Sequence, residues 1–254
     1  MSKRTIAEIS KRIKEGTMTS ADWEAFQRDE RKGVQKLLER YLKEKEKKAE
    51  QKAQFEEKRQ FEIAWISQGK QAIAGIDEAG RGPLAGPVVA GAVILPEGFY
   101  LEGLDDSKKL SLKKREAFFC RITEEADWGV GVVSSEEIDR LNIYQATKLA
   151  MKRAVEQLSV SPDHLLIDAM EIDYPACSQT SLVKGDQRSV SIAAASVIAK
   201  VTRDRYMAEL EEAYPGYHFR SNQGYGTSEH LEALRTLGAT PAHRKSFAPV
   251  KSVL

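Results

Sequence analysis

Two apolar runs joined by a glycine-rich turn constrain the fold of this chain more than any other feature. Residues 71–77 (QAIAGID) and 86–95 (GPVVAGAVIL) are rich in β-branched and small apolar residues and are bounded by glycine and proline, a pattern typical of two neighbouring strands. Further strands are predicted at 128–133, 164–168 and 181–184. The chain is therefore expected to build a sheet from short strands.

Segments of helical periodicity separate the later strands. They cover residues 111–126, with Ser111 as the N-cap, residues 134–158 and residues 191–214. Three adjacent strands followed by alternating helices and strands predict one mixed sheet with helices packed on it, which is an α/β fold.

The first 70 residues differ in composition from the rest. Residues 1–70 hold 18 lysine and arginine residues against 13 aspartate and glutamate residues, whereas residues 71–254 hold 21 against 25. Strong helix formers over residues 34–66 predict one long helix, and Ser20 with the acids after it predicts a shorter one that reaches Arg31. We therefore predict a basic, mostly helical extension over 1–70 and an α/β domain over 71–254. The long helix is either a solvated helix or a basic arm that contacts a phosphate backbone.

Missing patterns exclude several classes of protein and site. No apolar run approaches the length of about 18 residues that a membrane-spanning helix needs, and the N-terminus lacks the apolar stretch of a signal peptide, so we expect a cytoplasmic protein without membrane contact. Cys120 and Cys177 form no C-x-x-C pair, which disfavours a disulfide framework and structural zinc. Because the G-x-G-x-x-G, G-x-x-x-x-G-K-[ST], G-x-S-x-G and H-E-x-x-H motifs are absent, dinucleotide, P-loop, serine-hydrolase and zinc-protease chemistry is not expected.

Four carboxylates lie at or just after the ends of predicted strands. Asp77 and Glu78 end the first strand, Asp168 ends a later one, and Asp186 follows the last. Each one alone is more often a turn residue or a helix cap. If their strands are neighbours, the four acids meet at one edge of the sheet, where their repulsion is costly unless divalent cations neutralise it. Oxygen ligands suit Mg²⁺ or Mn²⁺, and two such cations can activate water and stabilise a leaving oxygen in phosphodiester hydrolysis.

A series of short motifs resembles a known family. The motifs occur in this order: 77–88 (DEAGRGPLAGPV), 106–110 (DSKKL), 166–168 (LID), 184–186 (KGD), 192–200 (IAAASVIAK), 224–227 (GYGT) and 242–247 (AHRKSF). From residue 71 to about residue 248 the chain thus resembles ribonuclease HII, the bacterial type 2 ribonuclease H. Pro83 and Asp186 favour this family over the related ribonuclease HIII.

The resemblance implies a ribonuclease H-like fold and a metal-dependent endonuclease. Such an enzyme would hydrolyse RNA in RNA/DNA hybrids and cut on the 5′ side of single ribonucleotides embedded in duplex DNA, leaving 5′-phosphate and 3′-hydroxyl ends. Asp77, Glu78, Asp168 and Asp186 match the metal-binding carboxylates of the family, with two divalent cations expected. The alternative from another class is a non-catalytic hybrid-binding protein in which these acids serve only as turns and caps. We further expect a monomer.

Two features are expected to recognise the substrate. The turn of Gly80, Arg81 and Gly82 carries little side-chain bulk, so its backbone can approach a sugar and test for a 2′-hydroxyl; a plain tight turn is the alternative. Tyr225 lies between two glycines, and the resemblance implies that its ring stacks at the junction of RNA and DNA. The alternative is a loop tyrosine that covers the edge of the core.

Other polar side chains are candidates for phosphate contacts, which compete with plain surface charge. The candidates are Ser107, Lys108, Lys109, Lys200 and Arg203. Lys200 and Arg203 share a helix face, although Arg203 could instead pair with a neighbouring acid. The excess of acids over residues 71–254 is unusual for an enzyme that acts on nucleic acid, but bound cations would offset it.

Overall fold

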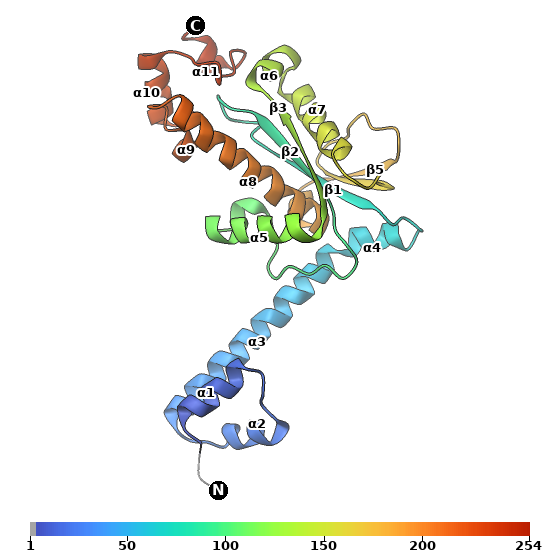
Figure 1. Cartoon of the computed structure of the whole chain (residues 1–254), viewed down its shortest axis with the longest axis vertical. Helices are drawn as coiled ribbons and strands as arrows, with labels where there is room; N and C mark the ends of the chain where they lie inside the picture. The colour runs from blue at the N-terminus through green and yellow to red at the C-terminus, as the bar shows by residue number, and fades with distance from the viewer. Residues whose placement is uncertain (1–3) are drawn as a thin grey trace. The chain divides into compact units, whose positions relative to one another are not determined.

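The structure, a computed structural model, describes residues 4–254, so the first three residues of the predicted extension lie outside the described part. Its contacts divide the chain into two compact units (Figure 1). One ends at Gln54 and is called the helical unit; the other runs from Phe55 to Leu254 and is called the sheet unit. By its contacts the segment 55–70 belongs with the sheet, although its composition groups it with the extension.

The helical unit consists of α1 (Ile6–Lys14), α2 (Ser20–Gln27) and the first part of α3 (Lys32–Lys58). Thr5 and Thr19 precede the first two helices, and each side chain accepts a hydrogen bond from the backbone N–H three residues later. This capping satisfies N–H groups that a helix start leaves unpaired. The sequence analysis predicted no separate helix at α1, although Ile6, Ile9 and Ile13 lie at helical spacing there. It also extended α2 to Arg31, beyond its end at Gln27.

A small apolar cluster holds the helical unit together. Its buried members come from all three helices and are Ile9, Phe26, Val34 and Leu38. Around this cluster, Asp22 pairs with Arg4 and Arg12. Hydrogen bonds from Arg4 and from the backbone lower the pKa of the Asp22 carboxyl below its ordinary value. The unit therefore combines a small core with caps and ion pairs.

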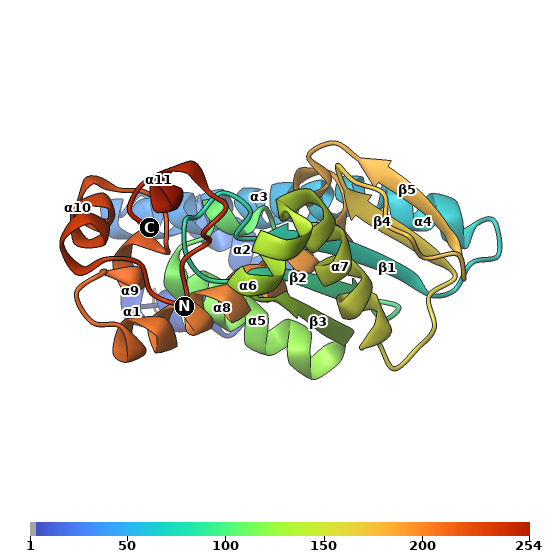
Figure 2. The same cartoon turned by 90° about the horizontal axis from the view of Figure 1, so that it is seen from above.

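A mixed five-stranded sheet in the order β3-β2-β1-β4-β5 forms the centre of the sheet unit (Figure 2). The strands are β1 (Ile73–Ala79), β2 (Val88–Ile94), β3 (Asp127–Val133), β4 (His164–Asp168) and β5 (Ser178–Leu182). β1 pairs antiparallel with β2 and parallel with β4, and β4 pairs parallel with β5. The carboxyl ends of β1, β4 and β5 therefore lie at the same edge of the sheet. The predicted mixed sheet is confirmed.

β5 lies earlier in the chain than the strand predicted at 181–184. Lys184 has a φ of 56°, a left-handed conformation that ends the extended backbone. The strand itself has the polar sequence SQTSL and lies at the edge of the sheet. An edge strand is paired on one side only and needs no continuous apolar run, so the sequence signal covered only the last two residues of β5.

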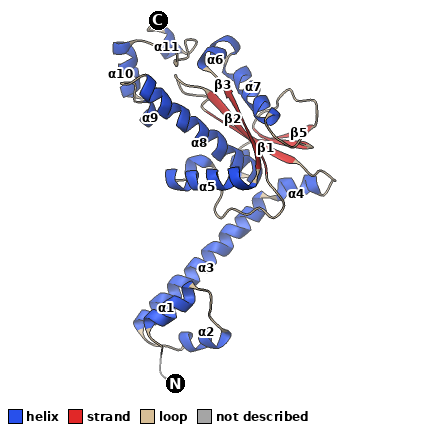
Figure 3. Cartoon of the chain, in the orientation of Figure 1, coloured by secondary structure: helices blue, strands red, loops and turns tan. Residues whose placement is uncertain are grey.

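Helices cover both faces of the sheet, as predicted (Figures 1 and 3). α8 (Val190–Ala213) and α5 (Leu112–Glu125) pack on one face, and α7 (Ile143–Glu156) and α6 (Ser135–Leu141) pack on the other. The remaining short elements are α9 (Phe219–Asn222), α10 (Ser228–Leu237), α11 (Ala248–Lys251) and the 3-10 turns η1 (Ser107–Lys109) and η2 (Gly185–Gln187). Among the helices of residues 4–254, none combines the length and the apolar character needed to cross a membrane.

The single helix predicted over 134–158 is broken between α6 and α7. Asn142 adopts a φ of 67°, and its side chain accepts hydrogen bonds from the N–H groups of Tyr144 and Gln145. Asn142 therefore ends one helix and caps the next. The apolar periodicity continues across this break, which is why it predicted one helix.

Two glycines bring the main helices into direct contact with the sheet. A Cβ at Gly75 in β1 would lie 2.1 Å from the carbonyl carbon of Ser191 in α8, and a Cβ at Gly131 in β3 would lie 1.8 Å from the carbonyl oxygen of Ala150 in α7. No side chain fits at either position, so backbone packs against backbone. At these two points the main helix on each face touches the sheet backbone directly, and buried side chains pack around the contacts.

The long helix predicted over 34–66 is two helices, α3 and α4 (Gln60–Ile66), which meet at Arg59. Aromatic side chains on the two sides of this break pack into different clusters. Phe55 of α3 lies in the cluster formed by α5 and α8, whereas Phe61 and Trp65 of α4 pack beside β4 and β5. The change of direction at Arg59 lets both groups be buried.

Candidate active site

Acidic side chains gather at the edge of the sheet where β1, β4 and β5 end. Asp77 and Glu78 lie near the end of β1, and Asp168 ends β4, which runs parallel beside β1. Asp186 lies in η2, which follows β5. The N–H of Gly185 donates a hydrogen bond to Asp168 Oδ1 at 2.6 Å, which ties η2 to β4. The structure thus brings the four carboxylates of the sequence analysis to one edge.

These acids share one electrostatic environment. Burial raises the pKa of Asp77 well above its ordinary value, and the charges of Glu78 and Asp168 raise it further. Burial also raises the pKa of Glu78. The pKa of Asp186 is raised by burial, then by the charges of Asp106 and Asp168. Each acid therefore disfavours the charge of its neighbours, and a cation among them would relieve this repulsion.

The donor set fits hard divalent cations. Carboxylate oxygens are the ligands that Mg²⁺ and Mn²⁺ prefer, and the residues that would hold such ions are Asp77, Glu78, Asp168 and Asp186. Across residues 4–254, no three acids, histidines or cysteines form a ready-made coordination sphere. Carboxylates of like charge gain nothing by approaching one another more closely when no cation lies between them. The four side chains are thus neighbours that a bound cation would draw together.

The η1 loop places a lysine among these acids. Partial burial opposes the charge of Lys108, but the carboxylates of Asp106, Asp77, Asp186 and Glu78 raise the pKa of its ammonium group above the ordinary value. Lys108 is therefore charged and offsets part of the repulsion. The carboxylate of Asp106, to which the sequence analysis gave no role, accepts the N–H of Lys108 at 2.9 Å and fixes this loop.

The two neighbours of Lys108 differ in their accessibility. Ser107 is buried, and its hydroxyl oxygen lies 2.8 Å from that of Ser196 in α8. Its hydroxyl therefore holds the loop against α8, which differs from the phosphate contact that was predicted. Lys109 pairs with Asp105 at 3.2 Å, and its side chain remains exposed. A phosphate contact by Lys109 is compatible with this position.

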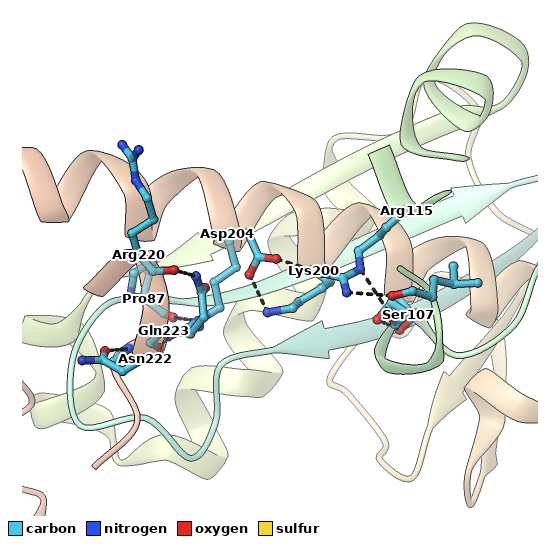
Figure 4. A network of polar contacts seen from close by, with 12 residues as sticks. Pro87, Ser107, Arg115, Lys200, Asp204, Arg220, Asn222 and Gln223 are labelled. Atoms are coloured by element: carbon cyan, nitrogen blue, oxygen red, sulfur yellow. Dashed lines mark hydrogen bonds and ion pairs between the residues drawn. The ribbon is translucent and has the colours of Figure 1, made fainter. Parts of the chain in front are cut away.

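Lys200 takes part in a network of ion pairs on α8 (Figure 4). Asp204 accepts hydrogen bonds from Lys200 and, at 3.0 Å, from Arg115 of α5. Arg115 also donates to the carbonyl oxygens of Ser107 and Leu110. This network holds the η1 loop, α5 and α8 together, and the side chain of Lys200 is partly exposed beside it.

Arg203 is buried, contrary to the phosphate contact that was predicted for it. Its guanidinium donates to the carbonyl oxygens of Pro87 at 3.1 Å, Ala85 at 3.3 Å and Gln223 at 2.9 Å. Burial lowers the pKa of Arg203 to about 10. A Cβ at Gly80 would lie only 2.0 Å from Arg203 Nε. Arg203 thus supports the glycine turn from inside the protein and does not face solvent.

Arg244 is a second buried support, which the sequence analysis missed. Its guanidinium donates to the carbonyl oxygens of Gly80 at 2.5 Å, Arg81 at 2.9 Å and Gly86 at 2.9 Å. Burial and the nearby charge of Arg203 lower the pKa of Arg244 to about 9. The only signal for Arg244 in the sequence was the motif at 242–247, which includes this residue but does not show which groups it contacts. Two guanidinium groups therefore fix the turn that follows β1.

Tyr225 is displayed beside this turn. Its side chain is 50% exposed, and a Cβ at Gly82 would lie 3.4 Å from Cε1 of its ring. The N–H of Leu84 donates to the carbonyl oxygen of Gly224 at 2.7 Å, which ties the two loops together. The structure therefore brings Tyr225 and the turn at 80–82 into one surface.

A pair of buried histidines supports the backbone of Tyr225. Nδ1 of His243 accepts the N–H of Thr240 at 3.0 Å, so the His243 proton is assigned to Nε2, which donates to Nε2 of His230 at 3.0 Å. His230 then carries its proton on Nδ1 and donates to the carbonyl oxygen of Tyr225 at 2.9 Å. Burial lowers the pKa of both imidazoles, to about 4 for His243. Both are therefore neutral near pH 7, each with one tautomer fixed by the network.

Comparison with known families agrees with the motifs. The family model described as Ribonuclease HII matches residues 74–250, and the model described as Ribonuclease HII N-terminal domain matches residues 5–65. Ribonuclease HII of Bacillus cytotoxicus is 55% identical over 256 residues, which cover 100% of this chain and 98% of that protein. Ribonuclease HII of Geobacillus thermodenitrificans is 58% identical over 233 residues, which cover 91% and 90%.

The fold agrees as well. The crystal structure of ribonuclease H2 from Pyrococcus horikoshii has a TM-score of 0.62 at 26% identity, covering 72% of this chain and 97% of that chain. The predicted ribonuclease H-like fold is therefore confirmed. Ribonucleases H act on RNA/DNA hybrids and depend on divalent metal ions. On the match of the family model and the identity of its relatives, the chain belongs to the ribonuclease HII family and is a ribonuclease H.

Proposed function

We propose that this enzyme hydrolyses the RNA strand of RNA/DNA hybrids and also cuts on the 5′ side of single ribonucleotides in duplex DNA, leaving 5′-phosphate and 3′-hydroxyl ends. The observation that carries this proposal is that the exposed ring of Tyr225 lies beside Gly82. Gly82 belongs to the loop that follows Asp77 and Glu78 in the chain. A ring able to stack on a sugar or base thus lies against the loop that follows two of the carboxylates. Recognition of a ribonucleotide and cleavage beside it would share one surface.

Two Mg²⁺ or Mn²⁺ ions are the proposed cofactors, held by Asp77, Glu78, Asp168 and Asp186. When bound, such ions activate water and stabilise the oxygen that departs from the phosphate. The protein's own part is to hold these ligands in place. Asp77 is 4% exposed in β1, and Asp168 is oriented by the N–H of Gly185.

The cations of the η1 loop and of α8 are proposed to contact phosphates of the substrate. Lys108 lies among the acids, where its charge also steadies the site before a metal binds. The side chain of Lys109 is exposed and that of Lys200 is partly exposed, so both can bind phosphates further along the backbone. Arg81 is also exposed, and its pairing with Glu78 at 3.4 Å leaves donors for a phosphate.

The geometry of the turn suggests how the sugar is recognised. Arg244 holds the carbonyl oxygens of Gly80 and Arg81. The carbonyl and the N–H of a trans peptide point in opposite directions, and the described chain has no cis peptide bond. The N–H groups of Arg81 and Gly82 therefore point away from the buried guanidinium. Outward N–H donors suit a 2′-hydroxyl oxygen, which RNA has and DNA lacks.

The test uses three duplexes: all DNA, an RNA/DNA hybrid, and DNA with one ribonucleotide. In Mg²⁺ we expect cleavage of the last two, with the single ribonucleotide cut once on its 5′ side. Ligation of the downstream product would show the 5′-phosphate, and extension of the upstream product by a polymerase would show the 3′-hydroxyl. Cleavage of the hybrid without any cut at the single ribonucleotide would contradict the proposal.

We infer a monomer that acts in the cytoplasm, with the basic extension adding affinity for the nucleic-acid backbone. The alternative of a non-catalytic hybrid-binding protein has no observation in its favour, because the chain belongs to a family of ribonucleases and keeps all four carboxylates.

A further inference from the structure

A buried carboxylate outside the proposed metal site makes an unusual set of contacts. Glu62 of α4 is 5% exposed, and its Oε1 accepts hydrogen bonds from Ser189 Oγ at 2.6 Å, Ser191 Oγ at 2.6 Å and Ser191 N at 3.0 Å. Its Oε2 is buried and makes no hydrogen bond within the described residues. A buried charge is costly unless its surroundings favour it. This carboxylate therefore requires an explanation that the proposed mechanism does not give.

The first part of the explanation is the position of Glu62 at the start of α8. Ser189 is the N-cap of this 24-residue helix, and its side chain accepts the N–H of Ile192. The N-terminus of a helix carries a partial positive charge and unpaired N–H groups, both of which favour an anion. Glu62 supplies that anion from another helix. Its contacts therefore fix the place at which α8 begins.

The second part is the short connection from these serines to the metal site. The N–H of Ser189 donates to the carbonyl oxygen of Gly185 at 2.8 Å, and the N–H of Gly185 donates to Asp168 Oδ1 at 2.6 Å. Asp186 lies between Gly185 and Ser189 in the chain. A continuous series of hydrogen bonds therefore leads from Glu62 through Ser189 and Gly185 to Asp168.

The aromatic residues of α4 reach the same elements. The ring of Trp65 stacks on His164, the first residue of β4, with 3.7 Å between the ring centroids. The guanidinium of Arg188, two residues after Asp186, lies 5.0 Å from the centroid of the Phe61 ring. Three side chains of α4 thus contact the segments that carry Asp168 and Asp186.

We propose that Glu62 is a positioning residue for this half of the metal site. By holding Ser189 and Ser191, it fixes η2 so that Asp186 is presented beside Asp168. The inference rests on the proposed metal site and goes beyond it, because Glu62 lies in the region matched by the N-terminal family model, at 5–65, and outside the region matched by the ribonuclease HII model, at 74–250. The N-terminal region would thus help to shape the site as well as contact nucleic acid.

The experiment measures Mn²⁺ binding by calorimetry in the full-length protein without nucleic acid. The variants are Glu62→Gln, which keeps the shape and removes the charge, and Glu62→Ala, which removes the contacts. The control is Glu57→Gln, an exposed acid on the neighbouring helix. Loss of a residue that orients metal ligands typically weakens metal affinity by 10 to 100-fold, so we expect about tenfold weaker binding in Glu62→Ala and a smaller loss in Glu62→Gln. The control should bind as the unaltered protein does.

A kinetic measurement separates positioning from a purely structural role. In Glu62→Gln the Mg²⁺ concentration at half-maximal cleavage should rise while the rate at saturating Mg²⁺ stays near normal. Mn²⁺ affinity that is unchanged in both Glu62 variants but reduced in Asp186→Asn would overturn the inference and leave the metal site intact. Mn²⁺ affinity that is unchanged in Asp186→Asn and Asp168→Asn would instead overturn the proposed metal site. If Glu62→Ala does not fold, Glu62→Gln and Ser191→Ala, which removes one donor, provide the same comparison.

Discussion

The helical unit and the sheet unit are stabilised in different ways. The helical unit has a small apolar cluster, and its acid Asp22 is held by two arginines around that cluster. In the sheet unit the main helices lie directly on glycines, and the guanidinium groups of Arg203 and Arg244 are buried on backbone carbonyls. The sheet unit therefore leaves little room for its site to shift, whereas we propose that the helical unit contributes through its surface charge. Each prediction below tests or refines this contrast.

The largest effect is expected from the acids at the sheet edge. Asp77→Asn should lower the cleavage rate at saturating Mg²⁺ by at least about a thousandfold, because a metal ligand supports several kcal/mol of transition-state stabilisation. Its thermal stability should hold or rise, since burial and neighbouring acids already disfavour the Asp77 charge. Single-turnover kinetics and a melting curve measure the two quantities. A rate near that of the unaltered enzyme would refute the assignment of Asp77.

Removal of a buried arginine should have the next largest effect. Arg244→Ala leaves the carbonyl oxygens of Gly80, Arg81 and Gly86 without their donor, so we expect a loss of about 3 kcal/mol in the free energy of unfolding. Arg244→Lys should recover only part of it, because an ammonium group cannot match the planar set of donors of a guanidinium. Denaturant unfolding measures both variants. Equal stability of Arg244→Ala and the unaltered enzyme would show that the turn is not fixed in this way.

A smaller effect is expected from the exposed ring beside the turn. Tyr225→Ala should slow cleavage at a single embedded ribonucleotide by about 10 to 100-fold, since stacking of a nucleic-acid group on an aromatic ring is worth about 1–3 kcal/mol. Tyr225→Phe should be milder, and the Mg²⁺ requirement should be unchanged because the ring holds no metal. The comparison is made between the embedded ribonucleotide and the hybrid. A defect limited to a raised Mg²⁺ requirement would contradict the stacking role.

The smallest effect is expected from the helical unit. Residues 1–54 hold 15 lysine and arginine residues against 10 acids, so their deletion should weaken substrate binding while the cleavage rate at saturation stays near normal. Each phosphate contact that is lost should reduce the slope of log K against log salt by about 0.9 on duplex DNA. An unchanged slope would mean that the extension is merely a solvated helical unit.

Two matched variants refine the deletion. Exchange of Lys45, Lys47 and Lys48 for glutamine keeps the helical unit but removes exposed charge, and should reproduce part of the change in slope. A deletion that reaches residue 65 would also remove Glu62 and Trp65, which pack in the sheet unit. It should therefore weaken metal binding in addition, an effect that the shorter deletion should lack.

The sequence predicted those features that depend on local pattern. The apolar run that stops at Asp168 gave the end of β4 correctly, because an acid gains nothing inside a core. The run that stops at Asp77 placed the end of β1 two residues early, since the strand continues to Ala79. The display of Tyr225 followed from the glycines on both sides of it. The motifs then grouped these positions into one family, which the comparisons confirmed.

The features that were missed depend on contacts between distant segments. Arg203 follows Lys200 by three positions, and this spacing predicts that both cations lie on the surface. In the structure Arg203 is instead buried, where it donates hydrogen bonds to the carbonyl oxygens of Ala85 and Gln223. Glu62 looked like one more charge in a charged helix, because Ser189 and Ser191 lie far along the chain. The sequence around such a residue does not indicate that it is buried, because its hydrogen-bond partners come from distant segments that only the fold brings close.

The glycines under the two main helices have a further consequence for motion. Where Gly75 lies against α8 and Gly131 against α7, backbone contacts backbone and no side chain can move aside, so we expect the sheet to open only when a whole helix separates from it. Backbone amides at the centre of β1 should then exchange their hydrogens with solvent only through global unfolding. The strand that carries Asp77 and Glu78 would have no partly opened state of its own. On heating, catalysis would consequently persist until the sheet unit itself melts.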